Sequence, residues 1–140
     1  MDLKGNSIGA NGTEIVKLYH RSGAILAETT YKNGKRNGID RNYYESGSLW
    51  YDIPYVNGIK HGIEHIYYTS GSIMWEIPHE NGKKDGVAKY YDESGALEWE
   101  IPYVTGTLHG IEKRYDKDKL NIYSVTLFNM DREVLSITLE

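Results

Sequence analysis

The sequence has no cysteine, which excludes disulfide frameworks, thiolate zinc sites and cysteine nucleophiles. It also has no excess of basic residues. The 140 residues include 16 Lys and Arg against 20 Asp and Glu, which gives a net charge of −4. A nucleic-acid-binding protein with a generally basic surface is therefore not expected.

Long apolar runs are missing as well. The first seven residues contain no apolar core of a signal peptide, and no stretch approaches the roughly 20 apolar residues of a membrane span. These absences predict a soluble, cytoplasmic protein. Phenylalanine occurs once, whereas tyrosine occurs 13 times. Because tyrosine combines an apolar ring with a polar tip, this bias predicts aromatic side chains at a boundary with water.

What the sequence does have is a repeat of 24 residues. Ser-Gly recurs at 22–23, 46–47, 70–71 and 94–95, and a second pair, Asn-Gly or Thr-Gly, recurs at 33–34, 57–58, 81–82 and 105–106. A third glycine series and all three prolines keep the same spacing. We therefore expect one repeat domain, 1–140, with an N-terminal cap (1–13), repeats 14–37, 38–61, 62–85 and 86–109, a degenerate repeat 110–133 and a C-terminal strand 134–140.

Each repeat contains two runs of Tyr, Ile, Leu and Trp between turn residues, which is typical of β-hairpins. The predicted fold is all-β: an elongated, twisted antiparallel meander of about ten strands. In unit three, loops of three residues at 69–71 and 80–82 would pair His65 with Trp75. Proline cannot donate to a strand ladder, so Pro54, Pro78 and Pro102 predict bulges or gaps in pairing. The expected structural turns contain Gly23, Gly34, Gly47, Gly58, Gly71, Gly82, Gly95 and Gly106.

In that register one face of the sheet carries a basic row beside an aromatic row. The basic row would be Lys17, Arg41, His65, Lys89 and Lys113. The pairs expected across strands are Arg41–Tyr51, His65–Trp75, Lys89–Trp99 and Lys113–Tyr123. Two interpretations stay open: cross-strand packing with cation–π contacts, and a groove that binds an acidic or aromatic partner. The candidate partner-binding residues are Arg41, Tyr51, His65, Trp75, Lys89, Trp99 and Lys113.

The other face would carry an acidic ladder of Glu28, Asp40, Asp52, Glu64, Glu76, Glu100 and Glu112. Cation binding by this ladder is one hypothesis, but a solvated acidic face is the preferred interpretation. His61 and His65 would lie about 13 Å apart along a strand, too far to share a metal. Neither a phosphate-binding glycine loop before a helix nor a nucleophile elbow occurs. We therefore expect no catalytic residues, no metal and no cofactor.

The segments 31–38 (Tyr-Lys-Asn-Gly-Lys-Arg-Asn-Gly) and 43–49 (Tyr-Tyr-Glu-Ser-Gly-Ser-Leu) resemble the MORN-repeat-variant family. The resemblance covers roughly residues 14–133 and implies an elongated sheet of hairpins. The 24-residue period and the Ile-Pro pairs depart from the usual pattern. Many bacterial members look like antitoxins or immunity proteins, and other MORN repeats serve as scaffolds or contact acidic lipid.

The leading hypothesis is a non-catalytic module that binds and inhibits another protein, such as a toxin or effector. The alternative is a membrane-surface adaptor that binds acidic lipid through the basic-aromatic stripe. The final strand would leave an exposed edge, so self-association through that edge is also expected.

Overall fold

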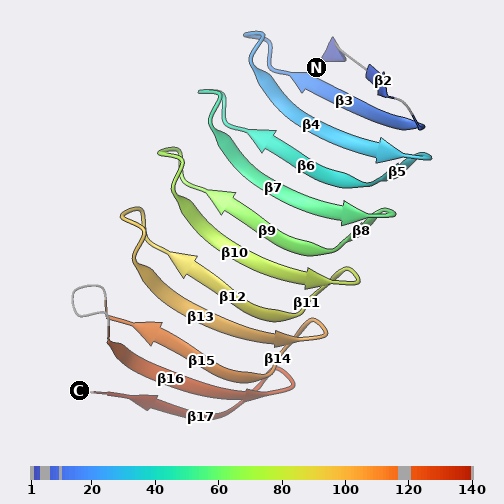
Figure 1. Cartoon of the computed structure of the whole chain (residues 1–140). Helices are drawn as coiled ribbons and strands as arrows, with labels where there is room; N and C mark the ends of the chain where they lie inside the picture. Colours follow the sequence, from blue (N-terminus) through green and yellow to red (C-terminus); the bar gives the residue numbers. More distant parts are fainter. Residues whose placement is uncertain (1, 4–6, 10, 117–120, 140) are drawn as a thin grey trace.

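The computed structural model describes residues 2–3, 7–9, 11–116 and 121–139, and side chains from residue 11 onward. The described residues form one antiparallel sheet in which consecutive hairpins lie side by side (Figure 1). The predicted all-β meander is confirmed. None of these residues belongs to a helix long and apolar enough to cross a membrane.

Strands of six to eight residues make up most of the sheet. They are β3 (Thr13–Tyr19), β4 (Ile25–Lys32), β6 (Gly38–Tyr43), β7 (Leu49–Val56), β9 (Gly62–Tyr67), β10 (Ile73–Glu80), β12 (Gly86–Tyr91), β13 (Leu97–Val104), β15 (Gly110–Tyr115), β16 (Ile122–Asn129) and β17 (Arg132–Thr138). The two-residue strands between them are β5 (Lys35–Arg36), β8 (Ile59–Lys60), β11 (Lys83–Lys84) and β14 (Thr107–Leu108). At the N-terminal end, β1 (Asp2–Leu3) and β2 (Ser7–Gly9) both pair with β3.

The loop at Thr69-Ser70-Gly71 has the predicted three residues. The backbone N–H of Gly71 donates to the carbonyl of Tyr68 at 2.9 Å, and Tyr68 N–H donates to the carbonyl of Ser72 at 2.9 Å. The loop glycines have positive φ, with values of 90°, 92° and 89° at Gly47, Gly71 and Gly95. Glycine suits this position because L side chains rarely adopt positive φ.

Three residues beyond this loop, a β-bulge changes the register. Tyr67 faces Ile73, but the next pair joins Ile66 to Trp75, so Met74 is an extra residue on β10. An extra residue moves every later side chain to the opposite face. The predicted pairing of His65 with Trp75 is therefore wrong, and His65 faces Glu76.

The same correction applies in the other repeats. Arg41 faces Asp52 rather than Tyr51, and Lys89 faces Glu100 rather than Trp99. In the last repeat Lys113 faces Val125 rather than Tyr123. Four residues separate Asp116 from Asn121, whose backbone groups close this hairpin, whereas three separate Tyr68 from Ser72.

The second loop of each repeat is shorter than predicted. Glu80 pairs with Lys83, so the loop is Asn81-Gly82 alone. Both residues have positive φ, 49° and 83°, which is the geometry of a type I′ turn. Asparagine tolerates the left-handed region because its short side chain bonds locally to the backbone.

The prolines mark gaps in pairing, as predicted. On its β11–β12 side, β10 pairs through His79 and Glu80 and again through Trp75 and Glu76, but Pro78 lies between these two segments. The carbonyl of Pro78 there accepts the N–H of Asp85 at 3.0 Å. The missing N–H of proline therefore falls where the neighbouring strand is interrupted.

The bulge sorts the side chains into two faces. The charged face carries the basic row, the tyrosines 24 residues apart from Tyr19 to Tyr115, and the acids Glu28, Asp52, Glu76 and Glu100. The aromatic face carries Tyr51, Trp75 and Trp99 with Asp40, Glu64 and Glu112. The predicted single acidic ladder is therefore wrong.

Burial differs between the two faces. Ala27, Ile53, Ala88 and Ile101 are buried on the aromatic face, with 2–9% of their surface exposed. The aliphatic row on the charged face stays 39–54% exposed at Ile39, Ile63, Val87 and Ile111. A single-layer sheet buries more of the face around which it bends, so the arched strands of Figure 1 enclose the aromatic face.

Candidate binding surface

A continuous row of cross-strand neighbours runs along the aromatic face. Each member faces the next in register, from β7 to β15. We call this set the aromatic row, and it consists of Tyr51, Ile66, Trp75, Tyr90, Trp99 and Arg114. Directly opposed side chains in an antiparallel sheet are close enough to contact one another, so the row forms one connected surface.

Ring geometry shows how closely the row packs. The ring centroids of Trp75 and Tyr90 lie 4.9 Å apart, and those of Trp75 and Trp99 lie 6.3 Å apart. At the end of the row, the guanidinium carbon of Arg114 lies 4.4 Å from the Trp99 ring centroid. The indole faces therefore accept both aromatic rings and a cation.

The bulge positions enlarge this surface, because their side chains lie beside the row. Trp50, at the bulge of β7, has its ring 5.1 Å from Tyr51 and 5.8 Å from Tyr44, and it remains 46% exposed. Glu98 occupies the equivalent position next to Trp99. The bulge that the sequence did not reveal therefore also supplies two side chains of the candidate surface.

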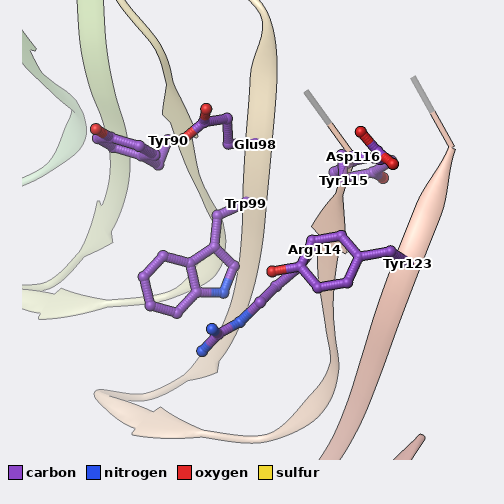
Figure 2. Close-up of a pocket in the computed structure, with 7 residues that line it drawn as sticks. All are labelled: Tyr90, Glu98, Trp99, Arg114, Tyr115, Asp116 and Tyr123. Carbon is purple, nitrogen blue, oxygen red and sulfur yellow. The ribbon is translucent and has the colours of Figure 1, made fainter. Parts of the chain in front are cut away.

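The last members of the row line a hollow of about 710 Å³. Figure 2 shows the Trp99 indole and the Arg114 guanidinium close together, with the Tyr123 ring next to Arg114. The indole Nε1 of Trp99 is buried and has no hydrogen-bond partner. The residues lining the hollow are Tyr90, Glu98, Trp99, Arg114, Tyr115, Asp116 and Tyr123.

Next to two of the loops, a tyrosine hydroxyl ties its hairpin to the following one. Tyr44 donates to the carbonyl of Tyr67 at 2.8 Å, and Tyr68 donates to the carbonyl of Tyr91 at 2.9 Å. The hydroxyl oxygens of Tyr68 and Tyr90 lie 3.1 Å apart, within hydrogen-bond distance. Burial raises the pKa of Tyr68, so the phenol stays protonated and keeps donating. These bonds hold the aromatic row on a rigid frame.

On the charged face, a tyrosine of each middle repeat bonds to a carboxylate of the preceding one. Tyr67 donates to Asp52 at 3.0 Å and Tyr91 donates to Glu76 at 2.8 Å. Burial, with a further contribution from these hydrogen bonds, raises the pKa of both tyrosines to about 12. The ladder continues at Tyr115, which donates to Glu100 at 2.7 Å. This hydrogen bond lowers the pKa of the Glu100 carboxyl.

The basic row is engaged by the same carboxylates. Lys17 and Arg41 contact Glu28 at 2.9 and 3.4 Å, and Lys113 contacts Glu100 at 3.4 Å. His65 Nδ1 lies 2.9 Å from Asp52. Lys89 lies between two acids, since Glu76 and Glu100 are its cross-strand neighbours. The cations and anions of this face therefore neutralise each other within the sheet.

The structure thus separates the predicted binding residues. Tyr51, Trp75 and Trp99 lie in the aromatic row, whereas Arg41, His65, Lys89 and Lys113 lie on the charged face. Sequence reasoning missed Tyr90 and Arg114 as members of the row. The sequence signal that could have found Tyr90 and Arg114 is the repeat position that they share, at intervals of 24 residues, with Asn42 and Ile66.

The acids on the aromatic face have partners as well. Thr29 donates to Asp40 at 2.6 Å, Lys60 to Glu64 at 2.8 Å, and Arg114 to Glu112 at 3.1 Å. Among residues 11–116 and 121–139, no group of three or more His, Asp or Glu side chains is arranged to hold a metal ion.

The chain's repeats match a known family model at residues 15–33, 36–57 and 84–104, and the family is described as the MORN repeat variant. Within these three segments the chain is similar to MORN variant repeats. Two of the matched segments contain Tyr51 and Trp99 of the aromatic row, so part of this row lies within MORN sequence. No curated protein sequence matches the chain.

Some solved structures are similar in shape to this chain. The structure of accessory secretory proteins 1, 2 and 3 of Streptococcus pneumoniae matches with 16% identity and a TM-score of 0.44, over 77% of this chain and 19% of that one. TarM matches with 9% identity and a TM-score of 0.48, over 80% of this chain and 21% of that one. The chain therefore spans about a fifth of these proteins, and the similarity is too low to indicate function.

Proposed function

We propose that this MORN repeat chain is a non-catalytic, cytoplasmic module that binds a partner protein through the aromatic row and thereby inhibits it. The observation that carries the proposal is the uninterrupted series Trp75, Tyr90 and Trp99, held in register by three neighbouring strands. Trp, Tyr and Arg dominate the hot spots of protein interfaces. Because these rings sit on a hydrogen-bonded sheet, binding orders few additional side chains.

The hollow next to Trp99 suggests the chemistry of the partner. Its lining combines aromatic faces with the carboxylates of Glu98 and Asp116. Arg114 already stacks on Trp99, so the indole face accepts a guanidinium. The chain also carries a net charge of −4. We therefore expect a partner segment that presents a Lys or Arg side chain beside an apolar residue, rather than the acidic partner suggested by the basic row.

Comparative affinity capture tests this proposal. The baits are the wild-type chain, Trp99→Ala, Glu98→Lys, and Val104→Ala as a control at an exposed position outside the row. We expect a protein that the wild type and Val104→Ala retain and that both row variants lose. Glu98→Lys matters most here, because it reverses charge at a partly exposed position without emptying a packed site. A protein retained equally by all four baits would refute the assignment of the aromatic row.

The retained protein then allows a quantitative measurement. We expect Trp99→Ala to weaken its binding by at least about 2 kcal/mol, the usual threshold for a hot spot. An activity assay of the partner, with and without the chain, tests the inhibitory role separately from binding. If the partner binds through the row but keeps full activity, the inhibitory role is contradicted and the binding role is not.

The ion pairs of the charged face argue against the acidic-lipid alternative. Lys17, Arg41 and Lys113 each contact a carboxylate, so lipid phosphates would have to compete with Glu28 and Glu100. We expect no co-sedimentation with vesicles that contain phosphatidylserine at physiological salt. Co-sedimentation that Lys89→Glu abolishes would instead support the lipid adaptor.

A further inference from the structure

Among the residues that the structure describes, the last strand, β17, pairs on one side only. Its partner is β16, and all seven of its residues are exposed. Three of them are apolar: Val134, Leu135 and Ile137, with 58%, 53% and 44% of their surface exposed. The strand contains neither proline nor lysine, which natural edge strands use to prevent further pairing.

An apolar groove leads to this edge on the charged face. It has a volume of about 160 Å³ and is lined by Ile111, Val125, Leu127, Leu135 and Ile137. Leu135 faces Leu127, and Ile137 faces Val125, both on the neighbouring strand β16. The groove therefore ends at Leu135 and Ile137, which a further strand paired with β17 would cover.

The backbone of β17 shows which groups are free to pair. The N–H of Leu139 donates to the carbonyl of Tyr123 at 2.6 Å, so Leu139 turns its polar backbone groups toward β16. In an antiparallel pair this direction alternates from residue to residue. Leu135 and Ile137 therefore also point inward, whereas the N–H and C=O groups of Ser136 and Thr138 point away from the sheet.

We propose that β17 pairs antiparallel with β17 of a second copy of this chain. The outward groups of Ser136 then exchange hydrogen bonds with those of Thr138 of the second copy, and the reverse pair forms by symmetry. Ile137 lies at the two-fold axis and faces Ile137 of the second copy. Leu135 faces Leu139 of the second copy, so the two apolar grooves join across the interface.

Two observations favour a second copy in this arrangement. The charged residues of β17 are Arg132 and Glu133, of opposite sign, so two copies of the strand do not repel each other. The opposite end of the sheet offers no matching edge, because only the short strands β1 and β2 lie there against β3. A two-fold contact also closes on itself, whereas a head-to-tail contact would continue into a fibre.

The register is centred on Ile137 because of a second bulge. Leu127 faces Leu135, but Phe128 faces Glu133, so Val134 is the extra residue. Centring the pair on Ser136 would place this bulge opposite Thr138 and distort the ladder. Centring on Ile137 uses only the regular segment 135–139.

Single cysteines test this register, because the natural sequence contains none. At Ile137→Cys the two Cα atoms would lie about 4.5 Å apart, the distance of a non-hydrogen-bonded pair, which a disulfide can bridge. At Leu135→Cys they would lie about 13 Å apart along the strands, which is too far. We expect mild oxidation to give a covalent dimer for Ile137→Cys and not for the matched control Leu135→Cys. Dimers from both variants, or from neither, would overturn the proposal.

The mass of the unmodified chain in solution gives a second test. We expect sedimentation to show a dimer for the wild type and for the exposed control Val104→Lys. Ser136→Pro should be a monomer, because it removes an outward N–H and no backbone bond to β16. Its melting temperature should fall only slightly, through loss of the 3.1 Å hydroxyl bond between Ser136 and Thr126. If Ser136→Pro fails to fold, Ile137→Lys replaces it, since a charge at the axis repels its own copy. A wild-type monomer, or a dimer that survives Ile137→Lys, would overturn the proposal.

Discussion

At Gly62, two requirements for glycine coincide. Its φ is +115°, a region that L residues rarely adopt, and a Cβ there would lie 3.0 Å from Cγ of Pro54 on the adjacent strand. At Gly71 only the first requirement holds, because φ is +92° and no atom lies within 4 Å of the Cβ position. The two glycine series that look alike in sequence therefore differ in their tolerance of a side chain.

We expect Gly62→Ala to lower the free energy of unfolding by about 1–3 kcal/mol more than Gly71→Ala does. The additional loss comes from the contact with the rigid Pro54 ring, a case of overpacking. Urea unfolding of both variants measures the difference. Equal losses would show that φ alone determines the need for glycine.

His79 occupies the repeat position that Tyr55 and Tyr103 hold in the neighbouring repeats. Of these three side chains, only the histidine can titrate near neutral pH. Its side chain is buried, and Nε2 lies 2.8 Å from Glu64. Burial lowers the pKa of His79 below 6.5, although the Glu64 hydrogen bond opposes that shift. The folded state therefore holds a neutral imidazole whose Nδ1 is buried without a partner.

Because the unfolded chain binds this proton more readily, the contribution of His79 to stability should fall as the pH drops below about 6.5. We expect His79→Tyr, which the equivalent positions tolerate, to become more stable relative to wild type between about pH 7 and pH 5.5. Unfolding curves at several pH values measure this difference, with His109→Gln as an exposed control. A difference that stays constant or shrinks toward pH 5.5 would contradict the assignment.

At the scale of the hairpin, the link between repeats is a tyrosine donating to a carboxylate of the preceding unit. The Tyr91–Glu76 bond is 2.8 Å long and joins β12 to β10. Hydrogen bonds to charged groups contribute more than neutral ones, although partial exposure reduces the gain. A double-mutant cycle with Tyr91→Phe and Glu76→Gln should give a coupling energy of about 1 kcal/mol in the free energy of unfolding.

The same cycle with Tyr91→Phe and Glu28→Gln serves as the control for that measurement. Glu28 belongs to β4 and bonds to Lys17 and Arg41, so its coupling to Tyr91 should be close to zero. Coupling of similar size in both cycles would point to a general charge effect rather than to the hydrogen bond.

The sequence predicted much at this scale, but not the bulge. The 24-residue period located the strands, and Gly71 indicated the three-residue loop, because both follow from local turn chemistry. The extra residue at Met74 has no local signature, since Trp50 and Glu98 at equivalent positions share neither size nor polarity. One signal was available: the shifted register places Arg41 opposite Asp52 and Lys89 opposite Glu100, and opposite charges stabilise such pairs.

For the whole molecule, the extra residue at each bulge decides which face of the sheet can bind a partner protein. With it, the basic row shares one face with Glu28, Asp52, Glu76 and Glu100, while Trp75 and Trp99 lie on the other face with the hollow. Without it, the indoles would stand beside the basic row and an acidic partner would fit. The repeat pattern alone could not distinguish these arrangements, because a one-residue slip leaves that pattern unchanged.

The bending of the sheet likewise belongs to the whole molecule. Ala27 and Ala88 are buried on the aromatic face, although no second layer covers that face among the described residues. The strands arch (Figure 1), and the face with the buried side chains is the one around which they bend. The aromatic row therefore lines the inside of the arch, which is a whole-chain property that no single repeat reveals.

The most direct test of this account uses two double-cysteine variants of the cysteine-free chain. The carbonyl of Pro78 points toward Asp85, so Glu76, two residues away on β10, forms a non-hydrogen-bonded pair with His65, with Cα atoms about 4.5 Å apart. His65→Cys with Glu76→Cys should form an intramolecular disulfide on mild oxidation. His65→Cys with Trp75→Cys should keep both thiols free, because these side chains lie on opposite faces. A disulfide in the second variant and not in the first would contradict the bulge and the assignment of both faces.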